Sequence, residues 1–179
     1  GQHVNILVTN DDGVRSKGLM ELVKALSLVG IVSVVAPDRE RSGMGHAITM
    51  HRPLRVTEIT TIPGAITGFQ VDGTPADCIK LGLEALLDHR PDLVVSGVNA
   101  GSNLGTDVLY SGTVSAAVEA LIMGIPAFAI SIADYSTEWL GLDAAVALAR
   151  RTAKAIQEKG LPEDTLLNIN LPRLPADQI

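Results

Sequence analysis

The chain has 179 residues, a formal net charge of -6, 46% hydrophobic residues and 3% aromatic residues. Its length suits one globular domain with a buried core, and no apolar run is long enough to span a bilayer. An acidic chain with few aromatic side chains lacks the basic surface and stacking platforms of nucleic-acid binders, so we expect neither nucleic acid nor membrane as a partner.

Predicted strands and helices alternate along the chain. Apolar runs rich in β-branched residues predict strands at 4–9, 31–36, 93–96, 127–132 and 166–170. Apolar residues at helical spacing, or helix-start residues, predict helices at 16–28, 75–88, 114–123 and 139–159. Two extended segments, 47–59 and 65–71, flank a Pro63-Gly64 turn and predict a β-hairpin.

Continuous apolar strands between helices are typical of a parallel sheet that is covered on both faces. We therefore predict an α/β fold, a doubly wound and mostly parallel sheet with a β-hairpin inserted after the second strand. Residues 4–179 are assigned to one domain, and residues 1–3, which do not begin with Met, are set aside as a candidate expression remnant. The single cysteine, Cys78, excludes an internal disulfide, indicates a reducing compartment and is expected in the core.

Asp11 and Asp12 directly follow the first predicted strand, at the sheet edge where open α/β sheets bind ligands. Two carboxylates about 5 Å apart repel by roughly 3 kcal/mol at an effective dielectric constant of about 20. A hard divalent cation, which prefers oxygen ligands, removes this repulsion. A helix cap followed by an Asp12-Gly13 turn is the alternative, but two acids at a strand end favour a metal site.

A charged loop, PDRERSGMGH (37–46), follows the second predicted strand. Arg39 and Arg41 are placed to attract a phosphate, although a solvated surface loop explains them equally well. His46 is equally compatible with a proton carrier and with a polar loop residue.

The segment SGVNAGSNLG (96–105) has three glycines at a spacing of four and two amides, Asn99 and Asn103. Glycines permit close approach of the backbone to a ligand, and the amides offer oxygens to a metal or N–H groups to a phosphate. The spacing matches neither the dinucleotide fingerprint nor the P-loop. A glycine-rich loop with left-handed asparagines is the alternative.

Tyr110-Ser111-Gly112-Thr113 leads into the predicted helix 114–123. Hydroxyls and free N–H groups at a helix start form an anion site. Simple N-capping by Ser111 or Thr113 is the alternative, and both can hold at once.

Five segments in this order resemble the SurE family of stationary-phase survival proteins: NDDG (10–13), APDRERSG (36–43), GTPADC (73–78), SGVNAGSNLG (96–105) and YSGTVSAAVE (110–119). Each segment is weak evidence alone, but the ordered set is specific, and the resemblance runs from about Val4 to Leu171. It implies a Rossmann-like core, a metal-dependent 5′/3′-nucleotidase, Mg²⁺ or Mn²⁺, a cytoplasmic location and a homodimer or homotetramer. Family members continue beyond the end of this chain, so we expect the C-terminal part of the family fold to be absent here.

The resemblance also implies a set of site residues. The metal ligands it implies are Asp11, Asp12, Ser42 and Asn99. The substrate- and phosphate-binding residues are Asn99, Asn103, Ser111, Gly112 and Thr113. We expect Asp11 and Asp12 to be the catalytic residues, and one of them to act as the general base. Tyr110 is the nearest candidate for stacking on a nucleobase.

The expected reaction is hydrolysis of nucleoside 5′- and 3′-monophosphates to nucleoside and phosphate, with short polyphosphate as a further candidate substrate. A non-catalytic module that binds nucleotide or metal is the alternative, and turnover separates the two.

Overall fold

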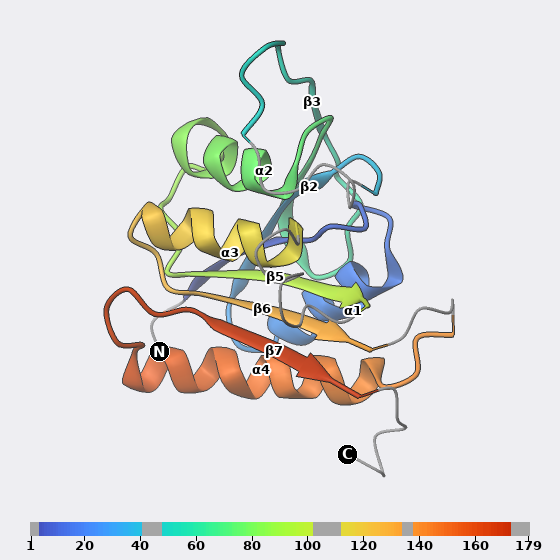
Figure 1. Cartoon of the computed structure of the whole chain (residues 1–179), viewed down its shortest axis with the longest axis vertical. Helices are drawn as coiled ribbons and strands as arrows, with labels where there is room; N and C mark the ends of the chain where they lie inside the picture. The colour runs from blue at the N-terminus through green and yellow to red at the C-terminus, as the bar shows by residue number, and fades with distance from the viewer. Residues whose placement is uncertain (1–3, 41–47, 102–111, 134–137, 173–179) are drawn as a thin grey trace.

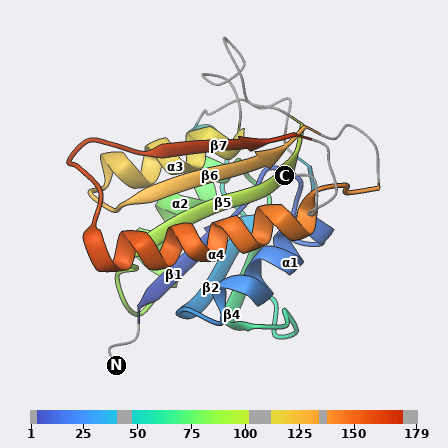
Figure 2. The same cartoon turned by 90° about the horizontal axis from the view of Figure 1, so that it is seen from below.

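The computed structural model describes residues 4–40, 48–101, 112–133 and 138–172. A single sheet crosses the molecule and carries helices on both of its faces (Figure 1). Seen from below, α1 and α4 lie in front of the sheet, whereas α2 and α3 lie behind it (Figure 2). The predicted doubly wound, Rossmann-like arrangement is therefore confirmed.

Within the described residues the sheet has seven strands in the order β3-β4-β2-β1-β5-β6-β7. Every neighbouring pair is parallel except β3 and β4. In chain order the strands are β1 (Asn5–Thr9), β2 (Ile31–Pro37), β3 (Val56–Glu58), β4 (Ala65–Val71), β5 (Leu93–Ala100), β6 (Ala127–Ile132) and β7 (Leu167–Leu171).

Four α-helices and one short π-helical turn are described. They are α1 (Lys17–Leu26), α2 (Pro75–Leu81), the π-helical turn η2 (Gly82–Leu86), α3 (Gly112–Ile122) and α4 (Leu142–Lys159). The start of α2 was readable from the sequence, because Thr74 and Asp77 form a capping box around Pro75. Among the described residues no helix is long and apolar enough to cross a membrane.

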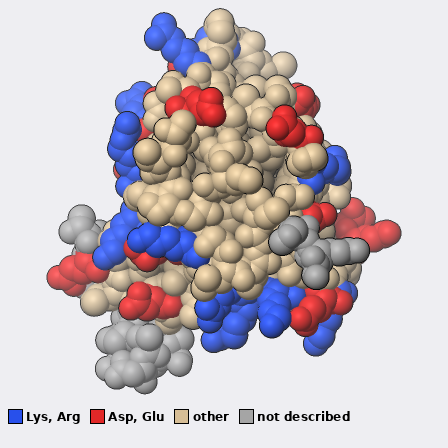
Figure 3. All heavy atoms as spheres, turned by 180° about the vertical axis from the view of Figure 1, so that it is seen from behind, with Lys and Arg blue, Asp and Glu red and all other residues tan. Residues whose placement is uncertain are grey.

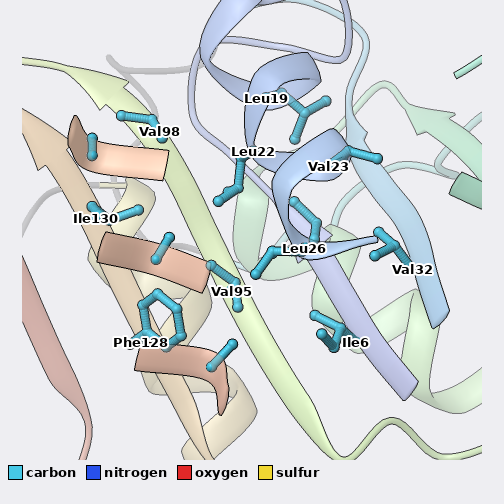
Figure 4. Packing of buried hydrophobic residues seen from close by; sticks show 14 of the residues in the cluster. Ile6, Leu19, Leu22, Val23, Leu26, Val32, Val95, Val98, Phe128 and Ile130 are labelled. Atoms are coloured by element: carbon cyan, nitrogen blue, oxygen red, sulfur yellow. The ribbon is translucent and has the colours of Figure 1, made fainter. Parts of the chain in front are cut away.

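Two apolar cores lie on the two faces of the sheet. On one face α1 buries Leu19, Leu22 and Leu26 against strand residues such as Ile6 and Val95 (Figure 4). On the other face α2 and α3 cover a second cluster that contains Cys78, whose side chain is fully buried. The prediction that Cys78 is a core residue is therefore confirmed.

The predicted hairpin exists, but it belongs to the main sheet. β3 pairs antiparallel with β4, and β4 pairs parallel with β2. The first arm is only three residues long and fully exposed, whereas the sequence predicted an extended segment over 47–59. A short edge strand has a partner on one side only, which limits the backbone pairing that can extend it.

Several element boundaries differ from the predicted ones, and two of the differences have a clear physical reason. β5 continues to Ala100 instead of ending at Ser96, with a register shift against β6 between Ser96 and Asn99. Gly97 allows this continuation, because a Cβ there would lie 2.5 Å from the carbonyl oxygen of Ile130. The helix α4 begins at Leu142 rather than at 139, because Gly141 has a φ of 92° and turns the chain into the helix.

Charged side chains of both signs are mixed on the molecular surface. On the face seen from behind, Lys and Arg side chains lie beside Asp and Glu side chains around the margin, and the middle is uncharged (Figure 3). Attraction of an anionic ligand to this acidic chain therefore depends on local groups, which are described below.

We expect Leu22→Ala to lower the free energy of unfolding by about 2–5 kcal/mol, because it opens a cavity beneath α1. Leu28→Ala is the matched control, since Leu28 is 70% exposed and its loss should change stability by less than about 0.5 kcal/mol. Urea unfolding of both variants measures the difference. Equal effects would contradict the assignment of α1 to the core.

Candidate functional site

The candidate site lies at the carboxyl ends of β1, β2 and β5. The chain runs outward from β1 to β2 on one side and resumes at β5 on the other side, so β1 and β5 flank the point where the strand order reverses. Open α/β sheets bind ligands at this point. Asp11, Asp12 and Asn99 all lie at this edge.

The turn after β1 is fixed by Asn10. The Nδ2 group of Asn10 donates to the carbonyl oxygen of Gly13 at 2.9 Å, and the Gly13 N–H donates to Asn10 Oδ1 at 3.1 Å. Gly13 has a φ of 109°, and a Cβ there would lie 3.0 Å from the backbone of Arg39. The N–H of Val14 then donates to the Pro37 carbonyl at 2.8 Å, which joins the loops after β1 and β2. The acid pair thus sits in a rigid turn, so the turn and the candidate metal site coexist.

The two carboxylates have limited access to water, since Asp11 is buried and Asp12 is half-buried. Asp11 is only 5% exposed. Burial, reinforced by the negative charges of Asp12 and Glu40, raises the pKa of Asp11 from 3.8 to about 7. Burial also raises the pKa of Asp12 to about 6, although the Ala100 N–H, 3.5 Å from Asp12 Oδ2, opposes the rise. A positively charged ligand would relieve both penalties.

Asn99 reaches this edge through the register shift near the end of β5. It is 8% exposed, and its Nδ2 donates to the carbonyl oxygen of Gly101 at 3.2 Å. Because the amide nitrogen is committed to the backbone, the amide oxygen is the atom that Asn99 can offer to a cation.

The first turn of α3 packs directly on Asp11. A Cβ on Gly112 would overlap Asp11 Oδ1 and would lie 3.0 Å from Asp11 Cγ and 3.1 Å from Pro75 Cγ. Gly112 therefore permits a close approach of α3 to the carboxylate. The first N–H groups of a helix lack partners within the helix and carry partial positive charge, so this contact brings an anion-attracting element beside the acid pair.

The described residues fit a hard cation better than a soft one. Among them no group of three or more His, Cys, Asp and Glu side chains could hold a metal ion. Two carboxylates and an amide oxygen are instead ligands of the kind that Mg²⁺ and Mn²⁺ accept. Ser42, Asn103 and Ser111, together with Arg41, His46 and Tyr110, lie outside the described residues.

Asp77 has a role that the sequence did not predict. We expected a first-turn acid of α2, but the carboxylate, which is 1% exposed, also accepts from Thr49 N at 2.7 Å and from Thr49 Oγ1 at 2.6 Å. It accepts from Thr74 N at 2.8 Å as well. Asp77 therefore fixes the chain that follows the charged loop onto the start of α2, and only a contact between distant segments reveals this.

We expect Gly112→Ala to lower the free energy of unfolding by about 1–3 kcal/mol, because the added Cβ has no space beside Asp11. Gly82→Ala is the control, since its nearest neighbour would be the flexible side chain of Leu7 at 3.3 Å. The loss should shrink when Asp11→Ala removes the clashing oxygen. Urea unfolding of the double variant Asp11→Ala/Gly112→Ala is the test. If the two substitutions lower the free energy of unfolding by amounts that simply add, the contact between Gly112 and Asp11 is contradicted.

The raised pKa values predict how the stability of the chelator-treated chain depends on pH. The folded chain binds protons at Asp11 and Asp12 more tightly than the unfolded chain, whose carboxyl pKa is near 3.8. The penalty for ionising them is absent below about pH 4 and complete above about pH 7, so stability should fall as the pH rises through this window. Thermal unfolding after chelation measures the slope, which Asp11→Asn should reduce. If the dependence of stability on pH is the same in Asp11→Asn as in the parent chain, the raised pKa of the Asp11 carboxylate is contradicted.

Comparisons with known proteins show the family of this chain. The family model "Survival protein SurE" matches residues 6–179. The 5′-nucleotidase SurE of Geobacter sulfurreducens is 57% identical over 98% of this chain and 65% of its own length. That of Carboxydothermus hydrogenoformans is 53% identical over 98% of this chain and 67% of its own length. The crystal structure of the SurE protein from Aquifex aeolicus has a TM-score of 0.88 and 44% identity, covering 98% of this chain and 68% of that one. The chain spans about two thirds of the length of these relatives, and it belongs to the SurE family.

Proposed function

We propose that this chain is a divalent-metal-dependent phosphatase that hydrolyses nucleoside monophosphates. The observation that carries the proposal is the buried Asp11, which lies next to the half-buried Asp12 and contacts the first turn of α3. Relatives at 57% and 56% identity bear the name 5′-nucleotidase SurE, which supports the substrate class.

Asp11, Asp12 and Asn99, with Ser42, would hold Mg²⁺ or Mn²⁺. When bound, such an ion polarises a phosphoryl oxygen and lowers the pKa of a water molecule. The acid pair supplies negative charge that is already desolvated, so little rearrangement of solvent accompanies ligand binding. We assign acceptance of the water proton to one of the two aspartates.

The phosphate is assigned to the start of α3. Gly112 and Thr113 belong to its first turn, where backbone N–H groups point away from the helix and attract anions. Asn103 and Ser111 complete the set that we propose for the nonbridging oxygens. These local dipoles and the cation offset the net charge of -6.

Several finer properties are part of the proposal. We propose activity on 3′- as well as 5′-monophosphates, with short polyphosphate as a further substrate. We also propose a cytoplasmic homodimer or homotetramer. These properties rest on the family resemblance.

The test is phosphate release from AMP, GMP and an aryl phosphate after chelation, followed by addition of Mg²⁺ or Mn²⁺. We expect release to return only with metal. Asp11→Asn and Asp12→Asn should each lower it by roughly 100-fold or more, since even partners outside the ligand shell are worth 10–100-fold.

Asp88→Asn is the control, because Asp88 is exposed and precedes β5 at the opposite edge of the sheet. Its activity should equal that of the parent chain. Near-normal release in both site variants at saturating metal would overturn the ligand assignment. Intact metal binding with no release from any substrate would instead support the non-catalytic binding module.

A further inference from the structure

Four oxygen atoms at the site are buried without a hydrogen-bond partner among the described residues. They belong to one carboxylate and three hydroxyl side chains: Thr9 Oγ1, Asp11 Oδ1, Ser96 Oγ and Thr113 Oγ1. Thr9, Ser96 and Thr113 are 0% exposed. Burying a polar group without a partner costs about 1–3 kcal/mol, so several such groups in one place need an explanation.

The strand register places Thr9 and Ser96 side by side. The Cα partners across β1 and β5 are Leu7 with Val94 and then Thr9 with Ser96. Leu7 and Val94 belong to the core under α2 and α3. Side chains two residues apart on a strand point to the same face, so both hydroxyls face this side of the sheet, on strands about 4.8 Å apart.

Asp11 and Thr113 come to the same place from other elements. Asp11 follows Thr9 by two residues, and its carboxylate lies against Gly112, the first residue of α3, which also approaches Pro75, the first residue of α2. Thr113 follows Gly112, on the same helical face as Ala117 and Ala120, which pack in this core. The three hydroxyls and Asp11 therefore lie on the same side of the sheet, the side covered by α2 and α3.

We propose that Thr9 and Ser96 are positioning residues for Asp11. Their hydroxyls donate hydrogen bonds to the buried carboxylate oxygen, Asp11 Oδ1, when the other carboxylate oxygen binds a divalent cation. Neither hydroxyl bonds to Asp11 Oδ1 in this structure, so the proposed hydrogen bonds form through a change of side-chain rotamer or a small shift of the carboxylate when the cation binds. Carboxylates that bind metals are themselves held by hydrogen bonds from the protein. The inference rests on the proposed metal site. Thr9 lies outside the five family segments, and Ser96 is the first residue of SGVNAGSNLG (96–105), but neither belongs to the set of site residues that the resemblance implies.

The proposal predicts opposite outcomes for two measurements on the hydroxyl variants, namely undiminished thermal stability and weaker metal binding. Thr9→Val and Ser96→Ala remove buried hydroxyls that have no described partner, so the chelator-treated variants should unfold at the parent temperature or about 2–4 °C above it. Their affinity for Mn²⁺ should nevertheless fall by roughly 10-fold or more. Thr9→Ser, which keeps the hydroxyl, should retain the parent affinity to within about threefold.

The experiment titrates the parent chain and the variants with Mn²⁺ alone, following free Mn²⁺ by electron paramagnetic resonance, and records thermal unfolding after chelation. Ser33→Ala is the matched control, a serine on β2 that is remote from the carboxyl ends of the strands. Weaker Mn²⁺ binding in Thr9→Val and Ser96→Ala, with undiminished stability and recovery in Thr9→Ser, supports the proposal.

Two results overturn it. Affinity within twofold of the parent in both variants would show that the hydroxyls do not act on Asp11. Lower affinity together with lower stability would show that they act only through packing. Should Thr9→Val fail to fold, Ser96→Ala decides by the same criteria. A parent chain that binds no Mn²⁺ would overturn the proposed metal site, and with it this inference, whereas intact Mn²⁺ binding without phosphate release would overturn the proposed function alone.

Discussion

The structure depends on placing two adjacent carboxylates, the buried Asp11 and the half-buried Asp12, at the end of β1. Burial raises the pKa of Asp11 to about 7 and that of Asp12 to about 6, so the acid pair opposes folding whenever both groups are ionised. The neighbouring backbone is built to hold them nevertheless: Asn10 closes the turn, and Gly112 leaves space for the Asp11 carboxylate. Such an arrangement persists only where surrounding packing is strong, and here two apolar cores flank the sheet.

The same contact explains how an acidic chain can bind an anion. Net charge acts over long distances and is screened by salt, whereas helix N–H groups and a bound cation act at contact distance in a site of low polarity. Because Asp11 touches the first turn of α3, a cation on the acid pair and a phosphate on the helix start would be neighbours. Each would then favour binding of the other, which is the arrangement that phosphoryl transfer requires.

Much of the fold was predictable because its strands are continuous apolar runs between helices, as Leu93–Val95 shows. The end of β5 was not, because Gly97 and Asn99 resemble loop residues, and the pairing of Asn99 and Ala100 with β6 keeps this segment in the sheet. Asp11 and Asp12 were predictable from their position after a strand. Ser42, Asn103 and Ser111 were reached only by resemblance to the family and lie outside the described residues. Thr9 and Ser96 looked like ordinary strand residues until the register placed them together.

A site of this kind is assembled from groups that are individually unfavourable for folding. A buried carboxylate pair, unpartnered hydroxyls and glycines inside regular elements each lower stability. They converge because the doubly wound topology brings the end of β1, the end of β5 and the start of α3 to one edge of the sheet, although these segments are far apart in the sequence. The proposed ligand would unite them, since one cation beside one helix start would offset several of these costs at once. The local conflicts with stable folding therefore mark the functional edge of the molecule more sharply than any single motif does.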